Sequence, residues 1–465
     1  MSDSRVNIAP RLRARERVVV HVDSPAVRWI GALAVLGLFC WLVLLLTRDH
    51  DRDWHAAGRL AWSLTLLTAV ALIARGIFLG RPVTAAHAWL SLAAVLAGLG
   101  AHVLVFDLLG NFLIVCAGAL LMWPTTAQPN PVDRQHIWKL VNATTGDPLA
   151  PFAMQEKKCY HFTADGTAAI AYRTRMGYAV VSGDPVGDET RYADLVADFA
   201  VMCHARGWRI VVLGCSQRRL DLWADGTVLG QTLRAVPIGR DVVIDVASFD
   251  MVGRKYRNLR QAVQRTHNFG ITTEVLPEQG LDGRTLAELT DVLLASPKGA
   301  RVERGFSMCL DGALEGRYPG VLLAVARDSD GRVQGFHRYA TAGQGSEVSL
   351  DVPWRRRDAP NGIDERLSVD MIAWTRENCG QRLSLAFAAF PEIFDDKNRG
   401  RMSSLIYTAI HLGDALIALE SLYRYLRKFH ALGDRRYVMA SMTQILPLLI
   451  VLLSLEFLPR RRRLA

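Results

Sequence analysis

Four apolar runs near the N-terminus constrain the fold of this chain more than any other feature. They cover residues 29–47, 60–79, 85–106 and the shorter 108–123. A helix needs about 20 mostly apolar residues to cross the hydrocarbon core of a bilayer. The sequence therefore predicts four transmembrane helices within residues 29–123, preceded by a basic tail over residues 1–28.

The distribution of arginines predicts how these helices are oriented. Five arginines lie in the tail: Arg5, Arg11, Arg13, Arg15 and Arg17. Basic residues close to membrane spans favour the cytoplasmic side. Four crossings return the chain to that side, so we expect the rest of it to form a cytoplasmic domain at the inner membrane of the cell.

A fifth apolar run, residues 438–458, lies near the C-terminus. Pro447 and Glu456 interrupt it, and arginines flank it on both sides. If it spanned the membrane, one basic flank would lie outside, against the usual bias. We expect residues 438–465 to form a membrane segment with a basic end. A spanning helix and a re-entrant or interfacial segment are equal alternatives.

Between these apolar ends, the composition is that of a globular domain with anionic partners. The 465 residues carry 22% charged side chains and a net charge of +10, which favours nucleic acid or lipid headgroups. The seven cysteines are scattered and form no C-x-x-C pair, which argues against a disulfide framework or a zinc site. H-E-x-x-H, P-loop and dinucleotide-binding motifs are absent, so we expect no metal and no cofactor.

The middle of the chain alternates β-rich and helical patterns after a linker at residues 124–131. Strand patterns occupy residues 166–182, 208–213, 241–246, 320–327, 333–340, 346–352 and 382–386. Helical patterns occupy residues 192–206, 251–268, 286–294 and 363–379. The alternation runs through two cycles, which predicts an α/β or α+β domain of two similar halves, residues 124–276 and 277–437.

Several short motifs occur in this region in a characteristic order. They are Gly-Asp-Pro-Val-Gly at 183–187, a basic helix around 253–260, Glu-Arg-Gly-Phe-Ser at 303–307, Ser-Leu-Asp at 349–351, Asp-Ala-Pro-Asn-Gly at 358–362 and the basic segment 426–437. Through these motifs, residues 140–440 resemble the C-terminal domain of the lysylphosphatidylglycerol synthase (phosphatidylglycerol lysyltransferase) family.

The resemblance implies two tandem acetyltransferase-like (GNAT) halves with a tunnel between them. It also implies that aminoacyl-tRNA, in particular lysyl-tRNA, enters from water and that the anionic lipid phosphatidylglycerol enters from the membrane. The lipid hydroxyl then attacks the aminoacyl ester, and the cationic product weakens the binding of antimicrobial peptides. The acetyl-CoA loop R/Q-x-x-G-x-G/A is absent, which agrees with a donor other than CoA.

Transfer from an activated ester requires a site for ammonium groups, help in deprotonating the hydroxyl, and donors to the oxyanion. Glu303 and Asp351 are the expected catalytic carboxylates because both lie in family-like motifs. The alternative is that each is a solvated acid at a turn or strand end. The resemblance implies an arginine three residues after this aspartate, since the family usually has one there, whereas the chain has Trp354. Arg355 either takes over its substrate contact or belongs to a solvated loop.

Six further residues are candidates for substrate binding. Arg257 and Arg260 lie on the basic helix and can neutralise phosphates of tRNA or of lipid. Asn361 precedes a helix whose first amides can bind an anion. The other candidates are Asp184 in the Gly-Asp-Pro turn, and Lys428 and Arg436 in the basic, aromatic C-terminal segment. For each candidate, a structural or solvated role is the alternative.

Three functions therefore remain open at the level of sequence. The leading hypothesis is a tRNA-dependent aminoacyltransferase that acts on phosphatidylglycerol. One rival is a GNAT-like enzyme that acylates another lipid, a peptide or an amine. The other is a non-catalytic membrane sensor with a degenerate transferase domain. The sequence leaves the oligomeric state open.

Overall fold

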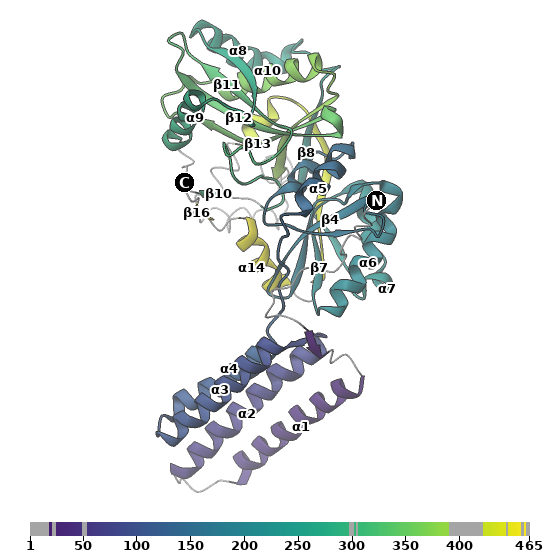
Figure 1. Cartoon of the computed structure of the whole chain (residues 1–465), viewed down its shortest axis with the longest axis vertical. Coiled ribbons are helices and arrows are strands. Elements are labelled where there is room, and N and C mark those ends of the chain that lie inside the picture. Colours follow the sequence, from purple (N-terminus) through teal and green to yellow (C-terminus); the bar gives the residue numbers. More distant parts are fainter. Residues whose placement is uncertain are drawn as a thin grey trace.

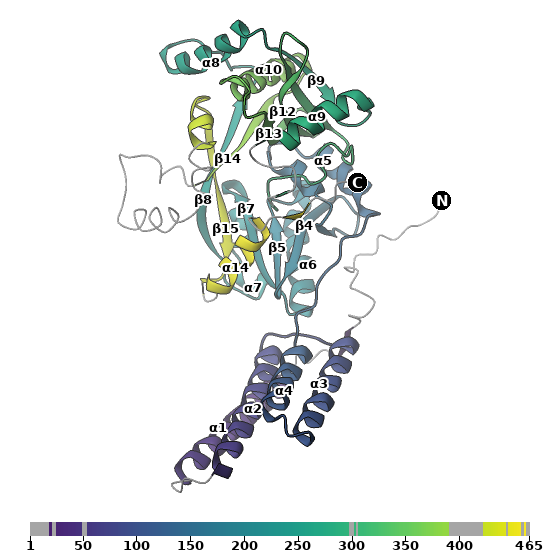
Figure 2. The same cartoon turned by 90° about the vertical axis from the view of Figure 1, so that its left-hand side faces the viewer.

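The computed structural model describes residues 18–20, 25–48, 54–296, 302–303, 306–389, 422–442, 445–456 and 460–461. Within this part of the chain, a bundle of long helices stands at one end of a larger α/β domain (Figure 1). A view at right angles shows the same separation (Figure 2). The bundle is formed by the N-terminal apolar segment, and the domain by the remainder.

The bundle consists of α1 (Pro25–Arg48), α2 (Trp54–Phe78), α3 (Ala85–Val103) and α4 (Asp107–Leu121). These helices coincide with the four apolar runs, so the helical prediction is confirmed. Among the described residues, the segments long and apolar enough to cross a bilayer are Leu60–Phe78 and Ala85–Val103. The 15 residues of α4 rise about 22 Å, less than the ~30 Å of a hydrocarbon core. Passage of all four helices through a membrane stays a prediction.

The α/β domain is built on one continuous sheet with strand order β3-β4-β5-β7-β15-β8-β14-β13-β12-β11-β9 and the short β6 beside β4. Its first strands are β3 (Cys159–Phe162), β4 (Ala168–Arg175), β5 (Tyr178–Ser182), β6 (Val186–Gly187), β7 (Arg209–Ser216) and β8 (Arg234–Asp245). The others are β9 (Thr272–Pro277), β11 (Val321–Arg327), β12 (Val333–Ala342), β13 (Glu347–Arg355), β14 (Arg382–Ala389) and β15 (Leu432–Ala440).

Each half of this sheet contains one parallel strand pair joined by a helix. In the first half, α6 (Tyr192–Ala205) connects β5 to the parallel β7. In the second half, α10 (Ile363–Glu377) connects β13 to the parallel β14. The other pairs along the described sheet are antiparallel. The prediction of a mixed α/β domain is confirmed.

The two halves exchange a strand at the centre of the sheet. β8 precedes the second half in the sequence but pairs with β14 of that half. β15 follows the second half but pairs with β7 of the first half. β8 and β15 also pair with each other, so backbone hydrogen bonds run without interruption from one half to the other.

Helices cover both faces of the sheet. One face, called here the α6/α10 face, carries α6, α8 (Arg257–Asn268) and α10, which bury their apolar sides in two clusters. The opposite face, called the α5/α9 face, carries α5 (Asp133–Ala143), the 3-10 helix η2 (Ala150–Met154), α9 (Gly283–Ala295) and α14 (Ile445–Glu456).

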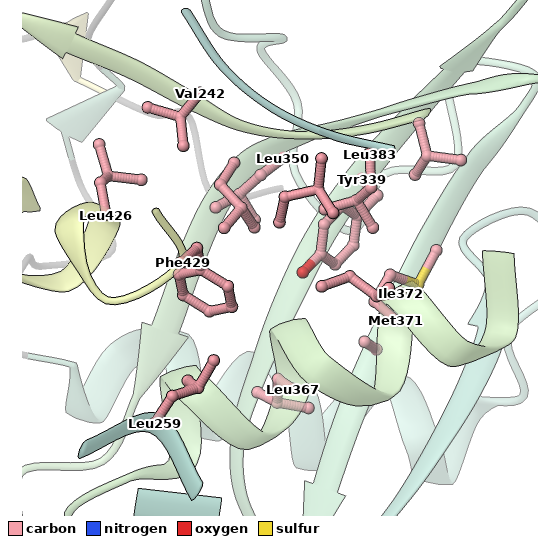
Figure 3. Packing of buried hydrophobic residues seen from close by; sticks show 14 of the residues in the cluster. Val242, Leu259, Tyr339, Leu350, Leu367, Met371, Ile372, Leu383, Leu426 and Phe429 are labelled. Atoms are coloured by element: carbon pink, nitrogen blue, oxygen red, sulfur yellow. The ribbon is translucent and has the colours of Figure 1, made fainter. Parts of the chain in front are cut away.

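The packing of α10 illustrates how these helices are held. Apolar residues three to four positions apart form a stripe on an amphipathic helix. Leu367, Met371 and Ile372 of α10 are fully or almost fully buried. Figure 3 shows them beside Leu350 and Leu383 of the sheet. This stripe fixes α10, and thereby its N-terminus, against β13.

The C-terminal apolar run has a place within the domain. Its first residues end β15, and Leu448, Val451 and Leu455 of α14 pack against the α5/α9 face. The other side of α14 exposes Leu449 and Ile450, by 51% and 55%. Its 12 described residues extend about 18 Å, compared with the ~30 Å of a hydrocarbon core. The membrane placement of this run, spanning or re-entrant or interfacial, stays a prediction.

Candidate functional site

In each of the two parallel strand pairs, the backbone pairing ends at an equivalent position and the strands separate beyond it. Pairing of β5 with β7 ends at Ser182, and pairing of β13 with β14 ends at Ser349. Each serine is followed two residues later by a buried aspartate, Asp184 or Asp351. The sequence Val-Ser-x-Asp at residues 181–184 recurs at residues 348–351, a repeat too short to recognise without the structure.

Asp184 belongs to a buried cluster of three carboxylates around one guanidinium. Arg436 Nη2 donates to Asp147 Oδ1 over 2.7 Å, and Arg436 Nε donates to Asp241 Oδ2 over 2.7 Å. Arg436 Nη1 lies 3.5 Å from Asp184 Oδ2. The backbone N–H of Ser216 donates to Asp184 Oδ1 over 3.0 Å. The Arg436 side chain is 1% exposed, so this candidate for substrate binding holds a buried cluster and does not lie at the surface.

The cluster has one positive charge for three acidic groups. Burial, and next the charge of Asp147, raise the pKa of Asp184 above its ordinary value. Burial raises the pKa of Asp241 to about 6, against the lowering effect of Arg436. Within the described part of the chain, Asp147 Oδ2 and Asp184 Oδ2 have no hydrogen-bond donor. Buried carboxylates require a proton or a cation, so this cluster favours a positive group beside it.

A loop over residues 144–149 links the open ends of the two strand pairs. Asp147 of this loop contributes to the acidic cluster of the first half. Ser349 Oγ donates to the carbonyl oxygen of Pro148 over 2.7 Å. Gly146 N–H donates to Glu347 Oε1 over 3.0 Å. The loop lies between α5 and η2, which places the acidic cluster on the α5/α9 face.

Asp351 belongs to a second buried ion cluster. Arg338 lies between Asp351 and Glu278, with 2.8 Å to each carboxylate, and all three side chains are fully buried. The backbone N–H of Leu310 donates to Asp351 Oδ1 over 2.9 Å, and that of Leu314 donates to Glu278 Oε1 over 2.6 Å. The cluster therefore fastens the segment 306–318 to the sheet.

Asp351 also sits at a β-bulge. Arg338 pairs with Val352 and Tyr339 with Leu350, so Asp351 has no partner directly across the ladder. Bulges often aim side chains at functional sites. Burial raises the pKa of Asp351 to about 6, whereas Arg338 and a backbone N–H lower it. Both carboxylate oxygens of Asp351 accept hydrogen bonds, one from Leu310 N–H and one from Arg338. This arrangement suits a residue that positions the segment 306–318.

A buried lysine connects the other expected catalytic motif to Ser182. Lys158 Nζ donates to Ser182 Oγ over 2.6 Å and to the carbonyl oxygen of Phe152 over 2.7 Å. It lies 5.0 Å from the centre of the Phe306 ring, which belongs to the Glu-Arg-Gly-Phe-Ser motif. Glu303 of that motif has its backbone in β10 (Val302–Glu303), and its side chain lies outside the described part of the chain.

Arg355 and Asp351 are not brought together. Arg355 Nε lies 3.6 Å from Asp364 Oδ2 in the first turn of α10, on the face opposite to the Arg338 cluster. Trp354, three residues after Asp351, is 8% exposed. Its ring centre lies 5.0 Å from that of Phe336 in the core beneath α9. The expected transfer of a substrate contact to Arg355 beside Asp351 does not fit this arrangement.

The remaining candidates lie around α8 and α10. Arg257, Arg260 and Asn361 are exposed. Arg260 Nη1 donates to a backbone carbonyl oxygen 2.8 Å away. Lys428 forms an ion pair with Glu365 of α10 and is 35% exposed. α8 lies at the end of the molecule opposite to the helix bundle in both views (Figures 1 and 2).

A hydrogen-bonded series on the α6/α10 face was not predicted. His337 Nε2 lies 3.1 Å from Asp364 Oδ1, and His337 Nδ1 lies 3.2 Å from the Tyr339 hydroxyl. That hydroxyl lies 3.5 Å from Ser368 Oγ, which lies 2.5 Å from the Tyr425 hydroxyl. Neither His337 nor Tyr339 belongs to a recognisable motif. The one signal in the sequence is their spacing of two residues, which places both side chains on one face of β12.

Comparisons with known proteins agree on the family. Residues 138–440 match the family described as phosphatidylglycerol lysyltransferase, C-terminal. The MprF-like domain protein Rv1619 of Mycobacterium tuberculosis is 65% identical over 98% of this chain and 95% of its own length. The lysylphosphatidylglycerol biosynthesis bifunctional protein LysX of Rhodococcus jostii is 29% identical over 73% of this chain. The matched region is 29% of that LysX protein.

Two solved structures share the fold. The C-terminal domain of a lysylphosphatidylglycerol synthetase from Agrobacterium fabrum superposes with a TM-score of 0.58 at 23% identity, over 70% of this chain and 98% of that one. L-PGS from Bacillus licheniformis gives 0.56 at 19% identity, over 70% and 96%. The family match covers most of the chain and spans both strand pairs. The chain therefore belongs to the phosphatidylglycerol lysyltransferase family and is a transferase.

Proposed function

We propose that this protein transfers an aminoacyl group, lysine in the first instance, from aminoacyl-tRNA to phosphatidylglycerol at the cytoplasmic face of a membrane. The oxygen of a lipid hydroxyl forms a bond to the ester carbonyl carbon, and the bond from that carbon to the tRNA ribose breaks. The hydroxyl proton passes to the leaving ribose oxygen. Family membership supports the reaction class.

The observation that carries this proposal is the acidic cluster at the open end of the first strand pair. Asp147, Asp184 and Asp241 surround the one guanidinium of Arg436. A lysyl ester brings two ammonium groups, and charge-assisted hydrogen bonds to carboxylates suit them. A cluster short of positive charge therefore favours an aminoacyl group with two ammonium groups, such as lysyl, over one with a single ammonium group, such as alanyl.

The positions of the basic helix and the apolar bundle support two separate substrate entrances. α8 exposes Arg257 and Arg260 at the end remote from the bundle (Figure 2). Phosphate neutralisation by such a helix favours nucleic acid there, because a bilayer around the bundle lies at the other end. The bundle exposes large apolar side chains such as Trp89, by 71%, and α14 exposes its own apolar side close by.

In this scheme, Asp351 and Glu303 have different roles. Asp351, with Arg338, holds the segment 306–318 that follows the Glu303 motif. We propose Asp351 as a positioning residue, and Glu303 as the group that assists proton transfer from the lipid hydroxyl. Asn361 and Lys428 stay candidates for contacts with the acceptor end of the tRNA.

The test is a transfer assay with the full chain in phosphatidylglycerol vesicles. Radioactive lysyl-tRNA and alanyl-tRNA are supplied separately, and the lipid is extracted and counted. We expect labelled lipid from lysyl-tRNA, and its loss after RNase treatment. Asp241→Asn should lower the rate about tenfold or more, as for loss of a hydrogen bond to a charged group. Asp245→Asn, an exposed aspartate on the same strand, is the control.

A membrane sensor with a degenerate transferase domain is the second candidate. It is favoured by Trp354, because this side chain fills core space at a position where the family resemblance implies an arginine. A sensor retains its cellular phenotype when Glu303 is changed to Ala. Loss of that phenotype in Glu303→Ala, together with labelled lipid from the wild type, would reject this candidate.

A further inference from the structure

Two adjoining cavities lie where the helix bundle meets the first half of the domain. They measure about 590 and 210 Å³, and both are lined by Gly80, Ala200, His204, Leu229 and Gly230. Their walls come from the end of α2, from α6, from α7 (Gly226–Leu229) and from the start of β7. Because α6 covers the face opposite to the acidic cluster, these cavities are separate from the candidate transfer site.

The lining of these cavities includes a group of exposed apolar side chains. Phe78 at the end of α2 is 72% exposed, Val201 of α6 is 69% exposed and Val228 of α7 is 46% exposed. All three line one or the other cavity. Phe78 also ends a helix segment long and apolar enough to cross a bilayer. An apolar surface continuous with such a helix is suited to a lipid chain.

Arginines from both parts of the molecule converge at the same junction. Arg75 near the end of α2, Arg81 in the following turn and Arg209 at the start of β7 all act on Tyr178. Burial, and next the charge of Arg75, lower the pKa of Arg81, and Arg209 lowers it further. Arg81 Nη1 donates to the carbonyl oxygen of Met122 over 3.0 Å. Among the described residues, Arg81 Nε has no acceptor.

This convergence is fixed by close backbone packing. Gly207, with φ +63°, precedes β7, and a Cβ there would lie 2.8 Å from both Arg81 Cα and the Gly80 carbonyl oxygen. Trp208 Nε1 also donates to the carbonyl oxygen of Thr125 over 2.9 Å. The bias of basic residues toward the cytoplasmic end of a span accounts for arginines beside α2. It does not account for Arg209, which belongs to the sheet.

We propose that this junction binds an anionic phospholipid that is not a substrate, with its phosphate beside Arg81 and Arg209 and an acyl chain along Phe78, Val201 and Val228. Arginine side chains form strong charge-assisted hydrogen bonds with phosphate. The site rests on the proposed membrane placement of the bundle. The bound lipid fixes the domain against the bilayer at a point distant from the acidic cluster.

The test uses phosphatidic acid, which carries the phosphate but no alcohol that could accept an aminoacyl group. The full chain is reconstituted in nanodiscs of phosphatidylcholine with phosphatidic acid, without tRNA. Lipids that remain bound after gentle detergent extraction are counted by native mass spectrometry. The variant is Arg81→Gln with Arg209→Gln, and the control is Arg284→Gln, whose side chain on α9 is 89% exposed.

We expect the wild type and the control to retain phosphatidic acid in preference to phosphatidylcholine. The double variant should bind it about 25-fold more weakly, since each cation near an anionic surface contributes roughly fivefold. The conservative variant Arg81→Lys with Arg209→Lys keeps both positive charges and should retain phosphatidic acid. Its retention would show that the junction tolerates substitution at both positions. Equal retention by wild type and Gln variant, or equal retention of phosphatidylcholine, would overturn the proposal.

Inorganic phosphate distinguishes a lipid site from a phosphate site. We expect 10 mM phosphate, on the order of the concentration that would saturate a weak anion site, to leave the lipid bound. Complete displacement by phosphate would overturn the proposal in favour of a small anion. The retention assay requires no transfer, so a protein that aminoacylates no lipid can still pass it, and an active transferase can still fail it.

Discussion

The buried carboxylate of Asp241 predicts that this domain loses stability as the pH rises. Its pKa is raised by burial from 3.8 to about 6. A carboxyl group with a raised pKa in the folded protein favours folding when it is protonated. That contribution is fully present below pH 3.8 and is lost as the pH rises through 6. The free energy of unfolding therefore falls as the pH rises, whereas a salt-bridged surface aspartate makes it rise with pH.

The magnitude follows from the difference between the two pKa values. A difference of about two units corresponds to roughly 3 kcal/mol over the whole titration. About 1.4 kcal/mol of it is lost between pH 5 and pH 7.5. For an unfolding entropy of about 2.1 cal/mol/K per residue and a domain of roughly 300 residues, that corresponds to a change of about 2 °C in the melting temperature. Asp241→Asn removes the titrating group, so its melting temperature should fall less over this interval.

The measurement is thermal unfolding of the detergent-solubilised chain at pH 5 and pH 7.5, for the wild type and Asp241→Asn. Asp245→Asn is the matched control, because hydrogen bonds from the Ser248 and Ala247 backbones hold the pKa of Asp245 below its ordinary value. Asp245 stays ionised throughout the interval and its variant should follow the wild type. Equal pH dependence in wild type and Asp241→Asn would refute the reasoning, since Arg436 would then keep Asp241 ionised.

Two further predictions concern buried side chains. Arg338→Met leaves Glu278 and Asp351 without their shared cation, and should destabilise the domain by about 3–5 kcal/mol; a melting temperature within a few degrees of the wild type would contradict this. Trp354→Arg introduces the arginine that the family resemblance implies at this position but buries a charge against Phe336. It should destabilise the domain by about 3 kcal/mol or more without raising transfer activity, and a gain in labelled lipid would show that the arginine reaches substrate.

Most regular elements could be predicted because their patterns are local. Strand alternation indicated β4 and β5, and helical spacing indicated α6 and α10, close to their observed bounds. The run 438–458 was harder to interpret, because hydropathy measures how apolar a segment is and does not show whether protein or lipid surrounds its side chains. Val438 and Leu448 are buried against protein, whereas lipid would have satisfied the same pattern. α8 begins later than predicted, after Gly253 with φ +91° and a 3-10 turn.

The candidate site depended on contacts that sequence alone does not supply. Asp184 was selected from a turn motif, but its neighbours Asp147, Asp241 and Arg436 come from separate parts of the chain. Arg436 was a candidate for substrate binding because it lies in a basic, aromatic segment. Its burial is possible because three acidic groups surround it, and no local pattern indicates that. Glu303 stays a prediction.

The exchange of β8 and β15 affects how the sheet can form while the protein is being synthesised. The first half cannot cover the free border of β7 until β15, near the end of the chain, has been synthesised. β8 likewise waits for β14 on one side and for β15 on the other. Unpaired strand borders invite association with other chains, and pairings this distant in sequence form slowly. A nascent chain of this protein therefore exposes unpaired strand edges until β15 is available to pair with them.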